Sequence, residues 1–325
     1  MNLSQPIAQV SSLQVPVPLP VHYTNCYVID TQDGYVIVDT GMNTKAAKEA
    51  WEEFIQHSRL DHEPVRLLFV THFHPDHLGL AQWLSERLDC PVTMMQGEAE
   101  FSATFRHPEQ ASSQHAQMHD FYRAHSVPDL IISNWLALDG AFRDTMTVPS
   151  AFEVVTNGET RTIGALDLTF VEQRGHTAHQ GLIYLSQPNV LLTGDQVLPR
   201  ITPNVSLWPS GPTNPLADYL SSLHQLLDLP HPIGLPAHEA TIDDVNARVM
   251  EILAHHERRN QKLIEFLQDG PATAYDLTRR LFTRPLDDYQ LQFAIGETLA
   301  HLEFLRVQQR IATRRSTGPI VYEIA

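Results

Sequence analysis

The chain has 325 residues, 42% of them hydrophobic, so it can bury the core of one large domain or of a large and a small one. Its 38 Asp and Glu against 22 Lys and Arg give a formal net charge of -16, which opposes general binding to phosphate backbones or anionic lipid. Two cysteines exclude a disulfide framework, and 18 histidines make transition-metal binding the first chemistry to consider.

No targeting or membrane segment is expected. The first twenty residues contain several prolines and no Lys or Arg, which fits neither a secretory signal nor a transit peptide. No apolar run reaches the roughly 18 residues that a membrane-spanning helix needs. We therefore expect a cytoplasmic protein without a membrane partner.

Strands and helices alternate in the first third of the chain, which predicts helices covering the faces of a sheet. The turn Gln32-Asp33-Gly34 predicts a hairpin between two β-rich runs. The expected strands are residues 21–30, 35–40, 65–71 and 91–95, and the expected helices are residues 44–57 and 78–88.

The pattern changes at residues 96–150, which are rich in aromatic, Met and His residues and which we interpret as a helical insertion that roofs the functional site. Its aromatic residues could equally pack only on each other or on a dimer partner, so a homodimer stays open. Strand signals resume at residues 152–155, 166–172, 182–185 and 190–193. Asn214-Pro215 is typical of a helix start and predicts a helix to about residue 229.

The end of the chain predicts a separate small domain. A long helical stretch at 243–268 ends at Asp269-Gly270-Pro271. Two amphipathic helices, at 274–281 and 287–309, then precede a β-like end, an order that is similar to a winged helix. We therefore predict three parts: residues 1–245, a connecting helix at 246–270, and a winged-helix domain at 271–325.

The strongest chemical signal is Thr71-His72-Phe73-His74-Pro75-Asp76-His77, directly after a strand that is expected to be buried. Pro75 disfavours helical geometry at His74, so His72 and His74 should lie on an extended stretch and point the same way. Asp76 and His77 would begin the next helix. Four ligand-type side chains can thus face one point, His72 and His74 serving one ion and the other two a second ion.

Three later loops offer further ligands, and each follows a strand signal. They are Gly175-His176-Thr177, Gly194-Asp195 and Pro236-Ala237-His238. Together with the motif at 71–77 and the early Val38-Asp39-Thr40-Gly41, this order resembles the metallo-β-lactamase superfamily over residues 15–245. The resemblance implies an α+β fold, a four-layer αββα sandwich, here with the helical insertion and the C-terminal winged-helix domain.

Carried over to this sequence, the resemblance implies a dinuclear centre. One metal ion would be held by His72, His74 and His176, and the other by Asp76, His77 and His238. Asp195 would bridge the two ions. Asp39 would orient a ligand histidine, although an ordinary aspartate at a strand end is an equal reading.

Ligand type favours two divalent ions, Zn²⁺ first, with Fe and Mn left open. Two such ions make a nucleophile of water, and Asp76 or Asp195 would hold it as the catalytic carboxylates. The expected enzyme is therefore a metal-dependent hydrolase acting on a thioester, ester or lactone. His74 supports this, because the diiron branch that reduces oxygen typically has Glu there. Residues 252–264, in the long helix, resemble the helix that leads to a C-terminal winged helix in a branch near the hydroxyacylglutathione hydrolases.

Three alternatives stay open. One is a single-stranded RNA nuclease or phosphodiesterase with the same metals, and another is a mononuclear-iron sulfur dioxygenase. The third is a regulatory module that binds a small acyl ligand without turnover. Seven basic against six acidic residues from position 271 onward leave the last domain near neutral, so we expect a small-molecule acyl substrate rather than nucleic acid.

Overall fold

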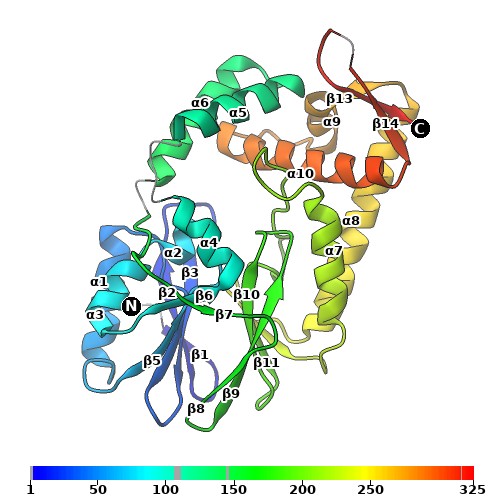
Figure 1. Cartoon of the computed structure of the whole chain (residues 1–325). Helices are drawn as coiled ribbons and strands as arrows, with labels where there is room; N and C mark the ends of the chain where they lie inside the picture. Colours follow the sequence, from blue (N-terminus) through cyan, green and yellow to red (C-terminus); the bar gives the residue numbers. More distant parts are fainter. Residues whose placement is uncertain (1–2, 106–110, 144–145, 316) are drawn as a thin grey trace.

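The computed structural model describes residues 3–105, 111–143, 146–315 and 317–325, and two β-sheets stacked between layers of helices form its larger part (Figure 1). The seven-stranded sheet has the order β1 (Leu3–Ile7), β2 (Val10–Pro16), β3 (Tyr23–Asp30), β4 (Tyr35–Val38), β5 (Val65–Phe69), β6 (Val92–Met95), β7 (Glu153–Val155). The five-stranded sheet has the order β12 (Ile233–Pro236), β11 (Val190–Gly194), β10 (Gln180–Leu185), β9 (Leu166–Gln173), β8 (Thr160–Ile163). The expected four-layer αββα arrangement is confirmed.

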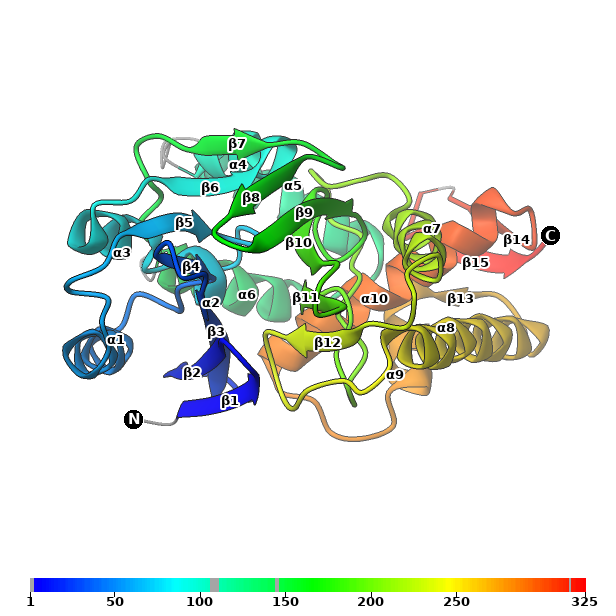
Figure 2. The same cartoon turned by 90° about the horizontal axis from the view of Figure 1, so that it is seen from below.

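Figure 2 shows the two sheets facing each other. Apolar side chains that alternate along the strands fill the space between them. On β5, Leu67 and Phe69 face the second sheet, whereas Leu68, and Val70 just after the strand, face the outer helices. This alternation follows from the two-residue period of a strand, and it explains why a strand buried on both faces is a continuous apolar run. The ring of Phe69 meets that of Phe170 on β9 at 5.2 Å between centroids.

The two outer layers are helical. The first contains α1 (Lys45–His57) and α3 (Ala81–Leu88), and the other contains α7 (Pro215–Leu226) and α8 (Val245–Gln268). Helix α7 begins where the sequence predicts, because the side chain of Asn214 accepts a hydrogen bond from the backbone of Ala217 at 3.3 Å.

Two expectations about individual elements need correction. The helix expected at 78–88 is split into α2 (Pro75–Leu78) and α3. Two contacts account for the interruption. The carbonyl of His77 accepts a hydrogen bond from the backbone N–H of Thr40, and Gly79 is packed so closely that a Cβ there would clash with the carbonyl oxygen of Pro75. Strands β1, β2 and β8 were not predicted because they contain many polar residues, and β12 was not predicted because it is very short.

The helices of the expected insertion pack on two different parts of the molecule, and that the insertion roofs the functional site stays a prediction. Of its helices α4 (Gln96–Thr104), α5 (Ala111–Ala124) and α6 (Asp129–Arg143), only α4 lies against the sheet that carries the motif at 71–77. Tyr122 and Trp135 of α5 and α6 pack instead on the C-terminal helices, where the indole of Trp135 donates to the carbonyl of Asp288 at 2.6 Å. Residues 106–110 and 144–145 of the expected insertion lie outside the described ranges.

The C-terminal part follows α8 and consists of two helices and a small sheet. These are α9 (Ala274–Leu281), α10 (Asp288–Val307) and the strands β13 (Ala272–Thr273), β15 (Val321–Ile324) and β14 (Ile311–Arg314), in that spatial order. In Figure 1, α10 lies across the open end of the sandwich, between α6 and α7. Within the described ranges, no helix combines the length and apolarity needed to cross a bilayer.

Candidate functional site

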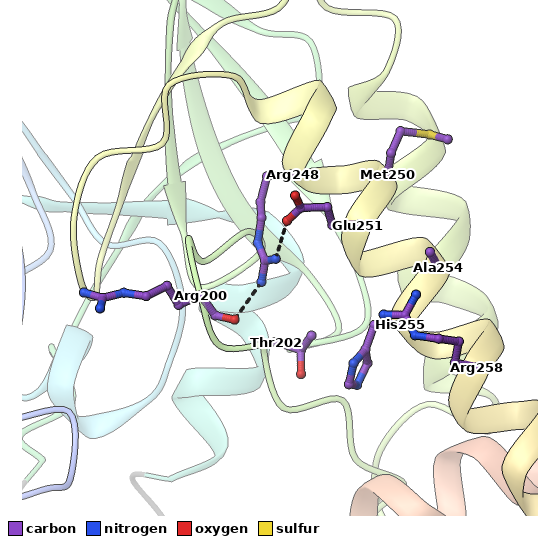
Figure 3. Close-up of a pocket in the computed structure, with 8 residues that line it drawn as sticks. All are labelled: Arg200, Thr202, Arg248, Met250, Glu251, Ala254, His255 and Arg258. Atoms are coloured by element: carbon purple, nitrogen blue, oxygen red, sulfur yellow. Dashed lines mark hydrogen bonds and ion pairs between the residues drawn. The ribbon is translucent and has the colours of Figure 1, made fainter.

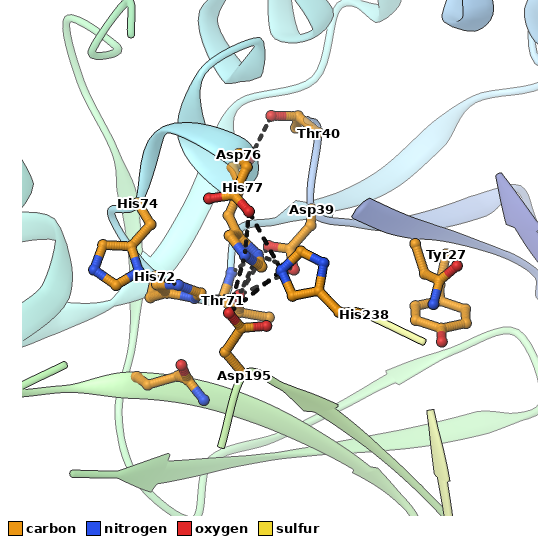
Figure 4. A network of polar contacts seen from close by, with 12 residues as sticks. Tyr27, Asp39, Thr40, Thr71, His72, His74, Asp76, His77, Asp195 and His238 are labelled. Carbon is orange, nitrogen blue, oxygen red and sulfur yellow. Dashed lines mark hydrogen bonds and ion pairs between the residues drawn. The ribbon is translucent and has the colours of Figure 1, made fainter. Parts of the chain in front are cut away.

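The seven predicted ligand residues all lie in segments that follow strands at one edge of the sandwich: Asp76 and His77 in α2, the other five in loops. Strands β4, β5 and β6 are parallel, so their carboxyl ends share an edge, and Asp39 and His72 follow two of them. In the second sheet, β11 and β12 are parallel, and Asp195 and His238 follow their carboxyl ends. Carboxyl ends of parallel strands are where α/β folds place their ligands. Figure 4 shows Asp195 rising from the second sheet toward the histidines of the first.

Three imidazoles form a first cluster, which consists of His72, His74 and His176. Nε2 of His72 lies 2.9 Å from Nδ1 of His74, and that atom lies 3.1 Å from Nε2 of His176. His74 is held in an extended conformation just before Pro75, at φ -58° and ψ 146°. The predicted geometry of the motif therefore brings its first two histidines together, and a loop about 100 residues later adds the third.

A second cluster consists of Asp76, His77 and His238. Nε2 of His238 lies 3.3 Å from Oδ2 of Asp76, and Nε2 of His77 lies 3.6 Å from the same oxygen. Asp195 lies between the clusters: its Oδ2 is 3.4 Å from His238, 3.6 Å from His77 and 3.6 Å from His176. One carboxylate thus reaches ring nitrogens of both clusters.

Asp39 fixes the outer ring nitrogen of His77 directly and that of His72 through Thr71. Asp39 accepts hydrogen bonds from the backbone N–H of Thr71 at 2.8 Å, from the Thr71 hydroxyl at 2.9 Å and from Nδ1 of His77 at 2.9 Å. Since the Thr71 hydroxyl donates to Asp39, it accepts from Nδ1 of His72 at 2.9 Å. Both rings therefore turn Nε2, rather than Nδ1, toward the site.

Backbone carbonyls fix the other two rings in the same way. Nδ1 of His176 donates to the carbonyl of Asn204 at 2.9 Å, and Nδ1 of His238 donates to the carbonyl of Tyr23 at 2.9 Å. Such an outer hydrogen bond selects the tautomer of a metal-binding histidine and orients its ring. Four histidines therefore share one arrangement, with the inner nitrogen free to bind a cation.

Burial, together with neighbouring His176, lowers the pKa of His74 to about 3. Burial, together with His77, also holds the pKa of His72 well below its usual value. The rings of His72 and His74 are therefore neutral at pH 7, as metal coordination requires.

In the second cluster, the attraction between histidines and carboxylates outweighs the effect of burial on their pKa values. Burial alone would lower the pKa of His77, but Asp76 and Asp39 outweigh it and raise that pKa to about 10. Burial alone would raise the pKa of Asp195, but His238 and His77 outweigh it and hold it well below the usual range. Ionised carboxylates buried together call for positive charge, which a divalent cation would supply.

A further observation indicates that these side chains form a metal centre. Nε2 of His77 and Oδ1 of Asp195 are buried and have no hydrogen-bond partner among the described residues. Buried polar atoms in proteins are nearly always satisfied, so such atoms facing one point indicate a missing ligand. Imidazole nitrogens with carboxylate oxygens are the ligands that Zn²⁺ prefers.

Sequence reasoning missed two kinds of group at this site. One is the pair of backbone carbonyls, of Asn204 and Tyr23, and a backbone atom leaves no mark in a sequence. The other is Glu98 on α4, which is 1% exposed and accepts hydrogen bonds from the loops on either side of it. An acidic residue just after the apolar strand at 92–95 was the available signal. Burial raises the pKa of Glu98 to about 7, against those hydrogen bonds.

Two other features lie apart from this site. His256, Glu297 and His301 form a buried group between α8 and α10, where Arg259 already pairs with Glu297 and Nδ1 of His301 donates to Asn260 at 2.7 Å. This group therefore has internal partners. A cavity of about 570 Å³ between α8 and the loop at 200–202 is lined by none of the seven ligand residues (Figure 3).

Two solved structures are similar to this chain over its whole length. The beta-lactamase domain protein from Burkholderia ambifaria superposes with a TM-score of 0.88 at 30% identity, over 100% of this chain and 94% of that one. The metallo-beta-lactamase family protein TTHA1429 from Thermus thermophilus gives a TM-score of 0.83 at 31% identity, over 98% and 99% of the two chains.

Sequence comparison agrees. The chain is 23% identical over 315 residues to the probable metallo-hydrolase YqjP of Bacillus subtilis, covering 94% of each protein. Residues 261–324 match the family model of the metallo-beta-lactamase-like C-terminal domain, and residues 19–238 match that of the metallo-beta-lactamase superfamily. With the stacked sheets and the two ligand clusters at their common edge, these matches show that the chain belongs to the metallo-β-lactamase superfamily.

Proposed function

We propose that the protein is a metal-dependent hydrolase that binds two divalent ions, with zinc expected first, and cleaves a thioester, ester or lactone with water. The observation that carries this proposal is the position of Asp195, whose Oδ2 lies within 3.6 Å of ring nitrogens from both clusters. The name of the B. subtilis relative, a probable metallo-hydrolase, is consistent with it.

In this proposal the two clusters hold one ion each. His72, His74 and His176 would hold the first, Asp76, His77 and His238 the second, and Asp195 would contact both. When bound, such ions lower the pKa of water and polarise the substrate's carbonyl oxygen. The carboxylates of Asp76 and Asp195 accept hydrogen bonds from the attacking water and orient it, so we assign these two as the catalytic residues.

An aromatic group beside the first cluster favours a substrate with an apolar acyl part. The ring of Phe73 lies 4.7 Å from that of His74, and it contacts Phe101 at 4.8 Å and Phe105 at 5.3 Å, all between centroids. These rings are partly exposed, so they offer apolar surface next to the ligands. Part of the insertion would thus contribute to the substrate site, through α4 and Phe105 at its end.

We infer that residues 271–325 form a winged-helix domain with a structural role. The order of α9, α10 and the β14–β15 hairpin, with β13 pairing β15, supports this assignment. Helix α10 contacts the loop that orients His176, because the side chain of Asn204 donates to the carbonyl of Phe293 at 3.3 Å. A module engaged in this way shapes the catalytic site, and its near-neutral charge does not favour nucleic acid.

The test combines metal analysis with a substrate panel. Purified protein should contain two zinc ions per chain and should hydrolyse members of a panel of thioesters, esters and lactones faster than bis-p-nitrophenyl phosphate. One iron per chain would instead favour the sulfur dioxygenase, and a preference for the phosphodiester or RNA would favour the nuclease. Full turnover after complete removal of metal would refute all three metal-dependent readings.

Replacing Asp195 is the matching mutational test. D195A removes the carboxylate that reaches both clusters, so we expect turnover to fall by at least about 100-fold. D120A is the control, because the Asp120 side chain is 87% exposed on α5. Equal turnover in the D195A variant and the wild type would contradict the proposal.

A further inference from the structure

Two separate loops carry the first cluster, and one buried side chain joins them. Phe73 lies between His72 and His74 in the first loop, and its backbone N–H donates to Oε1 of Glu98 at 3.0 Å. Thr177 follows His176 in the second loop, and its hydroxyl donates to Oε2 of Glu98 at 2.9 Å. The carboxylate of Glu98 therefore connects the segments that hold all three histidines.

A third hydrogen bond completes this connection. The backbone N–H of His179 donates to Oε2 of Glu98 at 3.2 Å, so each carboxylate oxygen serves one loop. Helix α4 is packed so closely here that a Cβ on Gly97 would lie 2.5 Å from the ring of His179. Glu98 can thus shift little, and the distance between the two loops is set by its two oxygens.

The second cluster has a comparable support in Asp39. That carboxylate accepts from Thr71 and from Nδ1 of His77, a member of the second cluster. The hydrogen bonds that Glu98 accepts, in contrast, come from neighbours of first-cluster residues. Asp39 therefore holds His77 of the second cluster and, through Thr71, also His72 of the first, whereas the groups bonded to Glu98 all neighbour first-cluster residues.

We propose that Glu98 is a positioning residue that sets the geometry of the first metal site, by holding the His72–His74 loop against the His176 loop. This rests on the proposed function, since it presumes that the clusters bind metal. It predicts that substitution of Glu98 weakens the binding of one metal ion selectively. A residue that served only the general stability of the fold would affect both sites.

The experiment measures metal binding by E98Q with the full-length protein. The introduced amide has one acceptor oxygen, so it cannot accept from both loops, while its size is unchanged. We expect one zinc ion to bind with wild-type affinity and the other to bind about 10- to 100-fold more weakly, in competition with a chromophoric chelator. The d–d absorption spectrum of the Co²⁺-substituted protein should change for one site only.

E100Q is the matched control, because Glu100 lies on the exposed side of the same helix and pairs with Gln96. It should bind both ions as the wild type does. If E98Q does not fold, E98D retains the charge on a shorter side chain and should show the same selective loss, less strongly. Unchanged binding of both ions, or equal weakening of both, would overturn the role of Glu98. Absence of metal binding by the wild type would instead refute the proposed function.

Discussion

In two of the motif histidines, the protein holds one ring nitrogen by a hydrogen bond and the other nitrogen faces the site. His77 and His72 turn their Nδ1 atoms to Asp39 and Thr71, which leaves each Nε2 for a cation. Asp39 itself has a φ of 64°, in the left-handed region that most side chains avoid and that aspartate tolerates better than most. Strain of this kind collects at functional sites, and it supports the reading of Asp39 as an orienting group.

The prediction at Asp39 follows from the number of its acceptor atoms. In D39N one oxygen is replaced by a donor, so the carboxamide cannot accept from both Thr71 and His77. We expect affinity for one of the two ions to fall by about 10- to 100-fold, as for other groups that orient metal ligands. Chelator competition measures it, and D33N, in the exposed β3–β4 turn, is the control. Wild-type affinity at both sites would contradict this role.

Between elements, the decisive contact is that of α10 with the loop at 204–207. Asn204 donates to the carbonyl of Phe293, and the backbone N–H of Leu207 donates to the carbonyl of Gly296 at 3.0 Å. A Cβ on Gly296 would lie 2.5 Å from the Ser206 hydroxyl oxygen. The C-terminal helix therefore touches the loop whose backbone orients His176.

Gly296→Ala should push this loop away from α10. Overpacking of this kind costs about 1–3 kcal/mol of unfolding free energy, and the displaced Asn204 carbonyl should also weaken metal binding through His176. Denaturant unfolding and metal titration test the two effects together. Gly318→Ala is the control, because the structure shows no described atom within 4 Å of a Cβ there. A variant with unchanged stability would show that the contact is loose.

The packing of α8 on α10 predicts acid sensitivity. Burial, together with His255 and Arg259, lowers the pKa of His256 to about 3, and His301 and Tyr219 face the same ring. Below pH 6.5 the unfolded chain protonates His256 and the folded protein does not, so the stability that this group contributes is lost as pH falls from about 6.5 toward 3.

H256Q removes this titration. Its unfolding free energy should fall less steeply with acid, by up to about 1.4 kcal/mol per pH unit below pH 6. Urea unfolding at a series of pH values, on wild type and variant in the same buffers, measures the difference. Parallel curves for the two proteins would contradict the prediction.

Across the whole molecule, the ligand clusters join the two halves of the sandwich. The motif at 71–77 belongs to the seven-stranded sheet, whereas Asp195 and His238 follow strands of the five-stranded sheet. Cations bound between them would therefore link the two sheets across their shared edge, in addition to the apolar core that lies between them. Binding to the folded state alone adds to stability by mass action.

Removing metal should accordingly lower the melting temperature of the whole protein. At free metal 100-fold above Kd each ion contributes about 2.7 kcal/mol, which corresponds to a shift of about 4 °C for a chain of this size. Thermal unfolding before and after chelation, and after zinc is restored, measures it. A melting temperature that does not respond to chelation or zinc would contradict the linkage of metal to the fold.

How much could be predicted depends on how local each signal is. The start of α7 at Pro215 and the limits of α9 at 274–281 follow from caps and short apolar patterns, and the structure has both as expected. The helix expected at 78–88 fails at Gly79, because the interruption comes from contacts with the loop at 40–43. Where α5 and α6 pack could not be predicted either, because they pack on a surface formed by residues about 150 positions later in the chain.

By itself, the sequence determined the family and the order of the ligand-type side chains, because His, Asp and Pro at fixed spacing leave few local conformations and one chemistry. Only the tertiary structure decided what holds those side chains in place: the carbonyls of Asn204 and Tyr23, the carboxylate of Glu98 and the approach of α10. The physical reason is that backbone atoms are the same in every residue, and a carboxylate gains its role from the groups that folding brings around it.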